Sequence, residues 1–177
     1  QADSYEVGPP HCVQLDSETM TSDQDAVLQR DLDGVDRNVT PFVIVVFHHP
    51  AYSSGLFHRA QKHPTRDRWE AILDSHHVNL VISGHEHNYE RSYPVVNQDS
   101  NDTGPGPYDS RDGPVYVVTG GGGAILYPDF VTTPSWSAVR AAVHEHVMLH
   151  ITRETIEATT FREDATVLDH FVLTSRD

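Results

Sequence analysis

Cysteine is nearly absent from this sequence. The 177 residues contain a single cysteine, Cys12, so no disulfide can form within the chain and no zinc cluster of thiolates can be built. Basic residues are also scarce, since 12 lysines and arginines stand against 26 aspartates and glutamates, which gives a formal net charge of −14. Such a surface repels nucleic acid, and a phosphorylated substrate could bind only where bound cations invert the local field.

Long hydrophobic runs and an initiator methionine are absent as well. No apolar run approaches the roughly 20 residues that a membrane-spanning helix needs, so we expect no membrane partner. The chain begins at Gln1 without a signal peptide, which is typical of a processed or partial chain. Its length is sufficient for one domain with a sizeable core.

Two apolar runs predict buried strands of a mostly parallel sheet. Residues 42–47 are continuous and rich in β-branched side chains, and residues 78–82 form a shorter run of the same kind. We expect a helix capped by Thr65 between these strands, and an earlier helix that begins at Ser22 and ends near Gly34. This order predicts a right-handed crossover that leaves the two strands parallel.

The remainder of the chain is predicted to form loops and antiparallel strands. Residues 1–21 show no clear period and contain a Gly-Pro-Pro sequence, so they are interpreted as a loop-like lead-in, and residues 97–114 as a long surface loop. Alternating patterns predict C-terminal antiparallel strands at residues 147–151, 155–161 and 169–173, after another buried strand at 115–119. Together these elements predict an α/β fold with a mixed sheet.

Histidine is the residue that the sequence has in excess, with 13 copies. His48 follows the first predicted strand, and His85 and His87 follow the second. Because neighbouring parallel strands lie about 5 Å apart and end at the same edge, these three imidazoles can converge on a metal. A structural role is the commoner alternative for any one histidine. His49 is interpreted as a residue that orients the loop or faces solvent.

Three other motifs have simpler interpretations. The His-Glu-His sequence at residues 144–146 repeats the spacing of the first pair, but it leads into an alternating strand. The four glycines at 120–123 lack the Lys-Ser or Lys-Thr of a phosphate-binding loop, so tight packing beside the site is expected. Asn38 and Asn101 begin Asn-x-Thr sequons, which permit N-glycans in a secreted protein.

The stretch Gly-His-Glu-His-Asn-Tyr-Glu-Arg at residues 84–91 resembles the Gly-His-x-His-x-Tyr-Glu-Arg motif of the purple acid phosphatases, within the calcineurin-like metallophosphoesterase superfamily. Residues 42–54 resemble the strand-then-histidine motif of this family, and residues 115–124 its glycine-rich segment. The resemblance extends over residues 22–177. It implies that residues 1–177 are the C-terminal portion of a single catalytic domain with an α+β sandwich of the metallophosphoesterase type.

The resemblance implies an acid phosphatase that hydrolyses phosphate monoesters with Fe(III) and a divalent metal, either zinc, manganese or iron. His48 and His85 resemble ligands of the divalent metal, and His87 resembles a ligand of the ferric ion. His58 falls in the loop where histidines of family members contact phosphate and protonate the leaving group. His63 is the alternative candidate for this role. The family also implies a glycoprotein that is secreted, extracellular or vacuolar-lysosomal.

Four residues of the same stretch are expected to support these ligands, namely Glu86, Tyr89, Glu90 and Arg91, with the last two as a buried ion pair. The carboxylate ligands of the family come from earlier motifs that this sequence lacks. We therefore expect the N-terminal half of the same protein, possibly as a separate chain, to supply them. The alternative is a non-catalytic metal-binding or interaction protein that has a phosphatase-like fold without the carboxylates.

Overall fold

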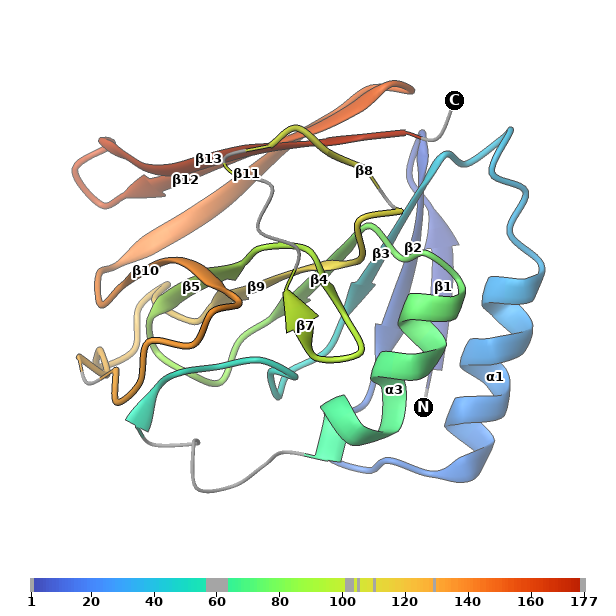
Figure 1. Cartoon of the computed structure of the whole chain (residues 1–177), viewed down its shortest axis with the longest axis horizontal. Coiled ribbons are helices and arrows are strands. Elements are labelled where there is room, and N and C mark those ends of the chain that lie inside the picture. Colours follow the sequence, from blue (N-terminus) through green and yellow to red (C-terminus); the bar gives the residue numbers. More distant parts are fainter. Residues whose placement is uncertain are drawn as a thin grey trace.

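The chain folds into three layers in the computed structural model, which describes residues 2–56, 64–100, 104, 106–109, 111–128 and 130–175. Two helices form the first layer, a seven-stranded sheet the second and a four-stranded sheet the third (Figure 1). Neither described helix is long and apolar enough to cross a membrane. The α/β architecture predicted from the sequence is therefore confirmed.

The seven-stranded sheet has the order β1-β2-β3-β4-β9-β5-β10. The central strands β2 to β4 and β9 pair in parallel, whereas β1, β5 and β10 pair antiparallel with their neighbours. The three strands predicted from apolar runs are confirmed as β3, β4 and β9. The seven strands are β1 (Ala2–Glu6), β2 (Pro10–Leu15), β3 (Phe42–Val46), β4 (Leu80–Ser83), β9 (Val115–Thr119), β5 (Tyr89–Ser92) and β10 (Ser137–Ala141).

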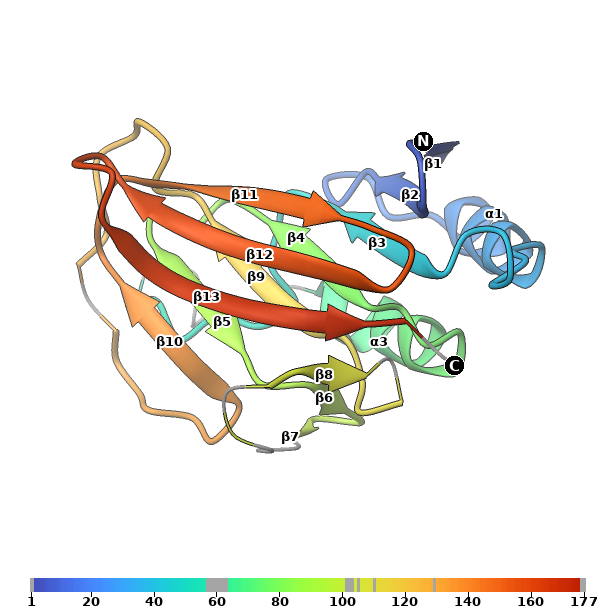
Figure 2. The ribbon, with the colours of Figure 1, turned by 90° about the horizontal axis from the view of Figure 1, so that it is seen from above.

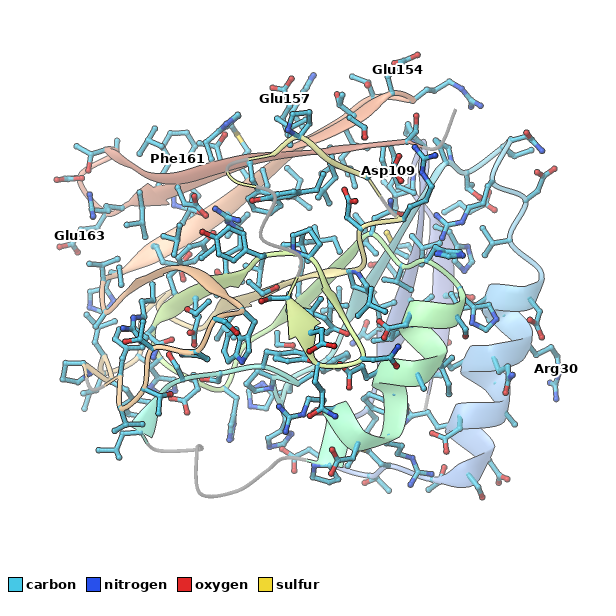
Figure 3. All side chains as sticks on the ribbon, viewed as in Figure 1. Arg30, Asp109, Glu154, Glu157, Phe161 and Glu163 are labelled. Carbon is cyan, nitrogen blue, oxygen red and sulfur yellow. The ribbon has the colours of Figure 1, made fainter. Side chains whose placement is uncertain are left out.

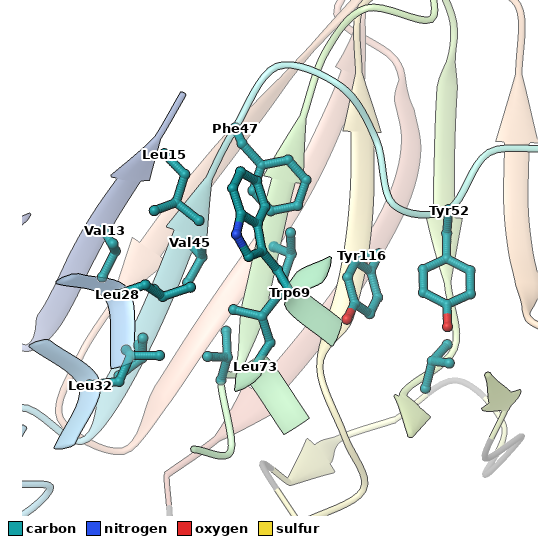
Figure 4. Close-up of a cluster of buried hydrophobic side chains, with 14 residues drawn as sticks. Val13, Leu15, Leu28, Leu32, Val45, Phe47, Tyr52, Trp69, Leu73 and Tyr116 are labelled. Carbon is teal, nitrogen blue, oxygen red and sulfur yellow. The ribbon is translucent and has the colours of Figure 1, made fainter. Parts of the chain in front are cut away.

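The helices α1 (Ser22–Asp33) and α3 (Pro64–Ser75) cover one face of this sheet. The N-cap of α1 is Thr21 and not Ser22, because the Thr21 hydroxyl accepts a hydrogen bond from the Gln24 N–H. Figure 4 shows the apolar core between helices and sheet, in which the Trp69 and Phe47 rings pack with their centroids 5.2 Å apart. This core holds the chain that leads from β3 to the predicted metal ligands.

The four-stranded sheet has the order β11-β12-β13-β8 and packs on the other face. Its strands are β11 (Glu145–Ile151), β12 (Thr155–Arg162), β13 (Val167–Thr174) and β8 (Tyr108–Asp109). The predicted C-terminal antiparallel strands are confirmed. The prediction of a loop at residues 97–114 is partly wrong, because this segment contains the short strands β7 (Asp99–Ser100) and β8. Strand β7 pairs with β6 (Val95–Val96).

Part of the seven-stranded sheet is left uncovered. In Figure 2 the strands β11, β12 and β13 lie over β4, β9 and β5, whereas β1 and β2 extend past the edge formed by β11. Val46 at the end of β3 is 37% exposed on this side, although its neighbours Val45 and Phe47 on the helix side are buried. The opposite face of the four-stranded sheet is mixed, with Glu157 directed to solvent (Figure 3) and Met148 53% exposed.

The interpretation of residues 1–21 as a loop is wrong. Strands β1 and β2 form a hairpin that continues the sheet beyond β3. Buried and exposed side chains alternate at the end of β2, since Val13 and Leu15 are buried toward the helices while Gln14 between them is exposed. Gly8, with a φ of +68°, makes the turn between the two strands, so the Gly-Pro-Pro sequence marks a hairpin turn and not a loop-like lead-in.

One buried ion pair joins the two sheets. The Arg91 guanidinium on β5 donates two hydrogen bonds to the Asp169 carboxylate on β13, at 2.6 and 3.1 Å, and both side chains are nearly inaccessible. Asp169 also accepts a hydrogen bond from the Tyr89 hydroxyl at 2.8 Å. The predicted pair of Glu90 with Arg91 is wrong, because adjacent residues of a strand point to opposite faces of the sheet.

We expect Asp169→Asn to lower the free energy of unfolding by about 3–5 kcal/mol, because Arg91 is left buried without a counter-charge. Urea denaturation of the purified chain measures the effect. The matched control is Arg111→Ala, which removes the exposed pair of Arg111 with Asp109 and should cost at most about 1 kcal/mol. Equal unfolding midpoints for the two variants would contradict the role given to the inter-sheet pair.

Candidate metal centre

Two strand ends bring the first histidines together. Strands β3 and β4 are parallel neighbours, and the pairing continues past their ends through the Phe47 N–H to the Ile82 carbonyl and the Gly84 N–H to the His48 carbonyl, both at 3.1 Å. His48 and His85 therefore leave the same edge of the sheet side by side. This is the edge where open α/β sheets place their ligands.

The two imidazoles face each other through nitrogen atoms. His48 Nε2 and His85 Nδ1 lie 3.0 Å apart, and the ring centroids are separated by 4.8 Å. Two imidazole nitrogens bound to one tetrahedral zinc ion at about 2.0–2.1 Å each are roughly 3.3 Å apart. The pair thus fits a shared divalent cation, and its neutral nitrogens are suitable donors for zinc, manganese or iron.

The backbone turns at His85 rather than at Gly84. His85 has a φ of +68°, in the left-handed region that residues with a β-carbon rarely adopt. Gly84 lacks a positive φ, and a β-carbon there would make only an ordinary contact with the His48 ring at 3.6 Å. Strain of this kind is retained where the surrounding structure fixes a functional side chain.

His87 is held by a different segment. Its Nδ1 donates a hydrogen bond to the Ile125 carbonyl at 2.8 Å, and its ring stacks on Tyr127 with centroids 4.2 Å apart. The Tyr127 N–H in turn donates to the His87 carbonyl at 3.0 Å. A ring proton on Nδ1 leaves the lone pair on Nε2, which is the usual arrangement for a metal-binding histidine.

His49 is the residue that the sequence interpretation undervalued. It does not face solvent, because it is only 8% exposed, and its ring lies against those of His48 and His85. Nitrogen atoms of these three histidines all lie within 4.8 Å of one another. The only signal in the sequence is the adjacency of His49 to His48, which does not reveal the direction of a side chain beyond a strand end.

Buried acidic residues support the loop between the histidines. The carboxylate of Glu86, which is fully buried, packs so closely on Gly55 that a β-carbon there would lie 2.7 Å from it. Glu90 accepts hydrogen bonds from the Ser54 N–H, the Ser54 hydroxyl and the Ser137 hydroxyl. Burial raises the pKa of the Glu90 carboxyl, although these donors act in the opposite direction. The loop after β3 and the loop after β4 are thereby joined.

The glycine-rich segment packs against the same loop, as the sequence predicted. A β-carbon on Gly120 would lie 1.9 Å from the Glu86 carbonyl, and the Gly120 N–H donates to the Asn88 carbonyl at 3.1 Å. Glu145 holds the next turn by accepting hydrogen bonds from the Thr119 hydroxyl and the Gly121 N–H. Glu145 begins β11, which confirms the interpretation of the second His-Glu-His sequence as the start of a strand.

His58 and His63, the predicted substrate contacts, lie outside the described residues, as does the sequon residue Asn101. Asn38, the other sequon residue, is exposed, and its side-chain amide donates to Asp36 at 3.0 Å. The roles given to these residues stay predictions.

Two family models match the chain. One, described as calcineurin-like phosphoesterase, matches residues 5–89, and the other, described as iron/zinc purple acid phosphatase-like protein C, matches residues 113–170. Together they span the histidine loops, the glycine-rich segment and most of the C-terminal strands.

Individual relatives agree with these models. Purple acid phosphatase 18 of Arabidopsis thaliana is 35% identical over 160 residues, which cover 86% of this chain and 34% of that protein. Fe(3+)-Zn(2+) purple acid phosphatase 12 of the same plant is 34% identical over 133 residues, or 72% of this chain and 28% of the relative. The chain therefore spans about a third of the length of these curated relatives.

A solved structure has the same fold. The purple acid phosphatase PPD1 from yellow lupin (Lupinus luteus) seeds superposes with a TM-score of 0.90 at 23% identity, covering 98% of this chain and 32% of the lupin chain. GAP50, described as the anchor in the inner membrane complex of Plasmodium, superposes with a TM-score of 0.75 at 17% identity, covering all of this chain and 54% of that chain.

We expect Gly120→Ala to lower the free energy of unfolding by about 3 kcal/mol, because the added β-carbon must displace the backbone of the histidine loop. Gly122→Ala is the matched control, since a β-carbon there meets nothing within 4 Å, and its effect should stay within about 0.5 kcal/mol. Urea denaturation of both variants measures the difference. Similar losses at the two glycines would contradict the close approach at Gly120.

Glu145→Gln should change how stability depends on pH. Burial raises the pKa of the Glu145 carboxyl, so its contribution to folding is largest at low pH and decreases as pH rises through that raised pKa. The stability of the variant relative to wild type should therefore increase between about pH 4 and pH 7.

Asp164→Asn provides a control of opposite sign. Hydrogen bonds from Thr166 lower the pKa of the Asp164 carboxyl, so the stability that it contributes is lost as pH falls. Urea denaturation between about pH 2 and pH 7 tests both variants, because the contribution of Asp164 is lost only below the ordinary carboxyl pKa of about 4. A stability of Glu145→Gln, relative to wild type, that decreases as pH rises would show that the pKa of Glu145 is not raised.

Proposed function

Because this chain belongs to the purple acid phosphatase family of calcineurin-like metallophosphoesterases, we propose that it supplies the histidine half of an acid phosphatase active site. The observation that carries the proposal is the pair of imidazole nitrogens 3.0 Å apart, His48 Nε2 and His85 Nδ1, beside a family motif at residues 84–91. The reaction is the hydrolysis of phosphate monoesters.

In this proposal His48 and His85 hold the divalent metal, which is zinc, manganese or iron, and His87 holds Fe(III). The bound pair of cations supplies charge that stabilises the phosphoryl oxygens and lowers the pKa of water at the site. The chain itself orients its ligands, since the Ile125 carbonyl and the Tyr127 ring fix His87 while buried Glu86 and Glu90 fix the loops.

His58 is proposed to contact the phosphate and to give a proton to the leaving alcohol, with His63 as a second contact. General acid catalysis by a positioned histidine is worth roughly 100-fold to 10,000-fold in rate. Both residues follow the Ser54–Gly55 segment, which is bonded to Glu90 and packed on Glu86. The same carboxylates therefore hold Ser54 and Gly55, the described residues that precede His58 in the chain.

The carboxylate ligands are proposed to come from an N-terminal half of the same protein, either continuous with this chain or separate from it. Two features support this partner. Strand β11 is the edge of the four-stranded sheet, and its inward residues Val147 and Leu149 are only half-buried. A groove of about 660 Å³ lies at the ends of β2, β3 and β4, and Val46, His48 and Ile82 help to line it. A partner that pairs a strand with β11 and fills this groove would cover both features.

We further propose that residues 1–177 are the C-terminal portion of one catalytic domain, and that the protein is a secreted or vacuolar-lysosomal glycoprotein. The exposed position of Asn38 supports glycosylation there, and the sequon at Asn101 is a second proposed site. Mass spectrometry before and after glycosidase treatment of the natural protein tests both sites.

Activity depends on the preceding sequence in this proposal. We expect hydrolysis of p-nitrophenyl phosphate by a chain extended with its natural preceding sequence, together with iron and a second metal in elemental analysis, and no hydrolysis by the 177 residues alone. His48→Ala and His85→Ala in the extended protein should each reduce kcat/KM by at least about 100-fold, since even outer partners of metal ligands cost about 10–100-fold.

The matched control is His76→Ala. His76 directly follows α3 and contacts Asp33, the last residue of α1, with 2.9 Å between Nε2 and Oδ1. The variant should retain activity. The enzymatic proposal would be contradicted if the extended protein bound no iron and cleaved no phosphate monoester. That outcome would favour the alternative, a non-catalytic metal-binding or interaction protein with this fold.

A further inference from the structure

A third imidazole stands beside the pair assigned to the divalent metal. The His49 ring centroid lies 4.2 Å from that of His85 and 5.0 Å from that of His48. The three rings are mutually tilted by 58° to 78°, so they form a cluster rather than a stack. Ring centroids of imidazoles on one tetrahedral zinc ion are on the order of 5 Å apart. All three distances are close to that value.

His49 is held in place by Ser17. The Ser17 hydroxyl accepts a hydrogen bond from the His49 backbone N–H at 2.9 Å and lies 3.0 Å from His49 Nδ1. Both residues are buried. In the tautomer with its proton on Nδ1, His49 donates to the Ser17 oxygen and keeps the lone pair of Nε2 for a metal. The arrangement corresponds to a ligand whose other nitrogen is fixed by the protein.

The surroundings of the cluster favour a cation. The exposed Glu18 places a carboxylate oxygen 3.6 Å from His49 Nε2. Asp3 and Asp16 line the groove that opens at His48. The whole chain carries a formal charge of −14. A divalent ion at the three nitrogens would therefore gain favourable electrostatic energy from its neighbours.

We propose that His48, His49 and His85 form a three-imidazole site that binds one divalent cation of the zinc class within this chain alone. Three histidines with an open fourth position are a sufficient protein ligand set for zinc. The inference goes beyond the proposed function, because it requires neither the preceding sequence, nor His87, nor a second metal. In the complete active site, His49 would add a third imidazole to the divalent position.

Titration of the 177-residue chain with Co(II) and with Zn(II) tests this site. We expect one metal per chain by calorimetry, and Co(II) absorption in the visible range with the intensity of a tetrahedral site. His49→Gln should weaken Zn(II) binding at least about 10-fold and reduce the Co(II) absorption. His76→Gln is the matched control, and circular dichroism verifies that each variant is folded.

Ser17→Ala separates ligation from a purely structural role of His49. This variant keeps the imidazole and removes its anchor, so it should weaken Zn(II) binding less than His49→Gln. Equal affinities of wild type and His49→Gln would overturn the proposal, as would equal losses in the Ser17 and His49 variants.

A measurement on wild type covers the case in which His49→Gln does not fold. The ring ¹⁵N signals of three histidines should shift together on addition of one equivalent of Zn(II), and a His49 signal that does not move would also overturn the proposal. Because none of these measurements uses phosphatase activity, their failure is distinguishable from failure of the proposed enzymatic function.

Discussion

The buried ion pair of Arg91 with Asp169 is the interaction on which the site depends. It joins β5 to β13 across the interior, and Tyr89 adds a third hydrogen bond to the same carboxylate. Tyr89 is the first residue of β5 and directly follows the histidine loop. Anchoring β5 to the second sheet therefore also fixes the C-terminal end of that loop. The attraction within a buried ion pair adds little net free energy to folding, because both charges lose their hydration. The pair acts mainly by fixing the relative position of the two sheets, because either charge would be strongly unfavourable if it were buried without the other.

The histidine loop is confined from three sides. The Glu86 carbonyl packs closely against Gly120, and the Glu86 carboxylate packs against Gly55. His85 has a positive φ. The positive φ of His85 would be unfavourable in an isolated peptide, so this conformation is imposed by the structure around the loop. The pair of nitrogens is therefore preorganised, so a metal at the proposed site would bind with little further ordering cost.

Much of the architecture could be predicted from the sequence, because apolar runs and histidines at their ends are local signals. The parallel crossover and the adjacency of His48 to His85 follow from them, whereas the sandwich is implied by the family resemblance. The β1–β2 hairpin was missed because its alternation is short and its Gly-Pro-Pro turn resembles a loop. His49 was undervalued because side-chain direction after a strand end depends on Ser17, 32 residues earlier. The partner of Arg91 lies 78 residues away and has no sequence signal.

That long separation has a consequence for the order of assembly. During synthesis from the N-terminus, the strand that bears Arg91 leaves the ribosome 78 residues before Asp169 does. Until then the guanidinium lacks the carboxylate that satisfies it in the finished fold, and the second sheet cannot close over the first. The histidine loop would therefore acquire its final shape only after Asp169 has been made, and a metal at the proposed site would be bound late in folding.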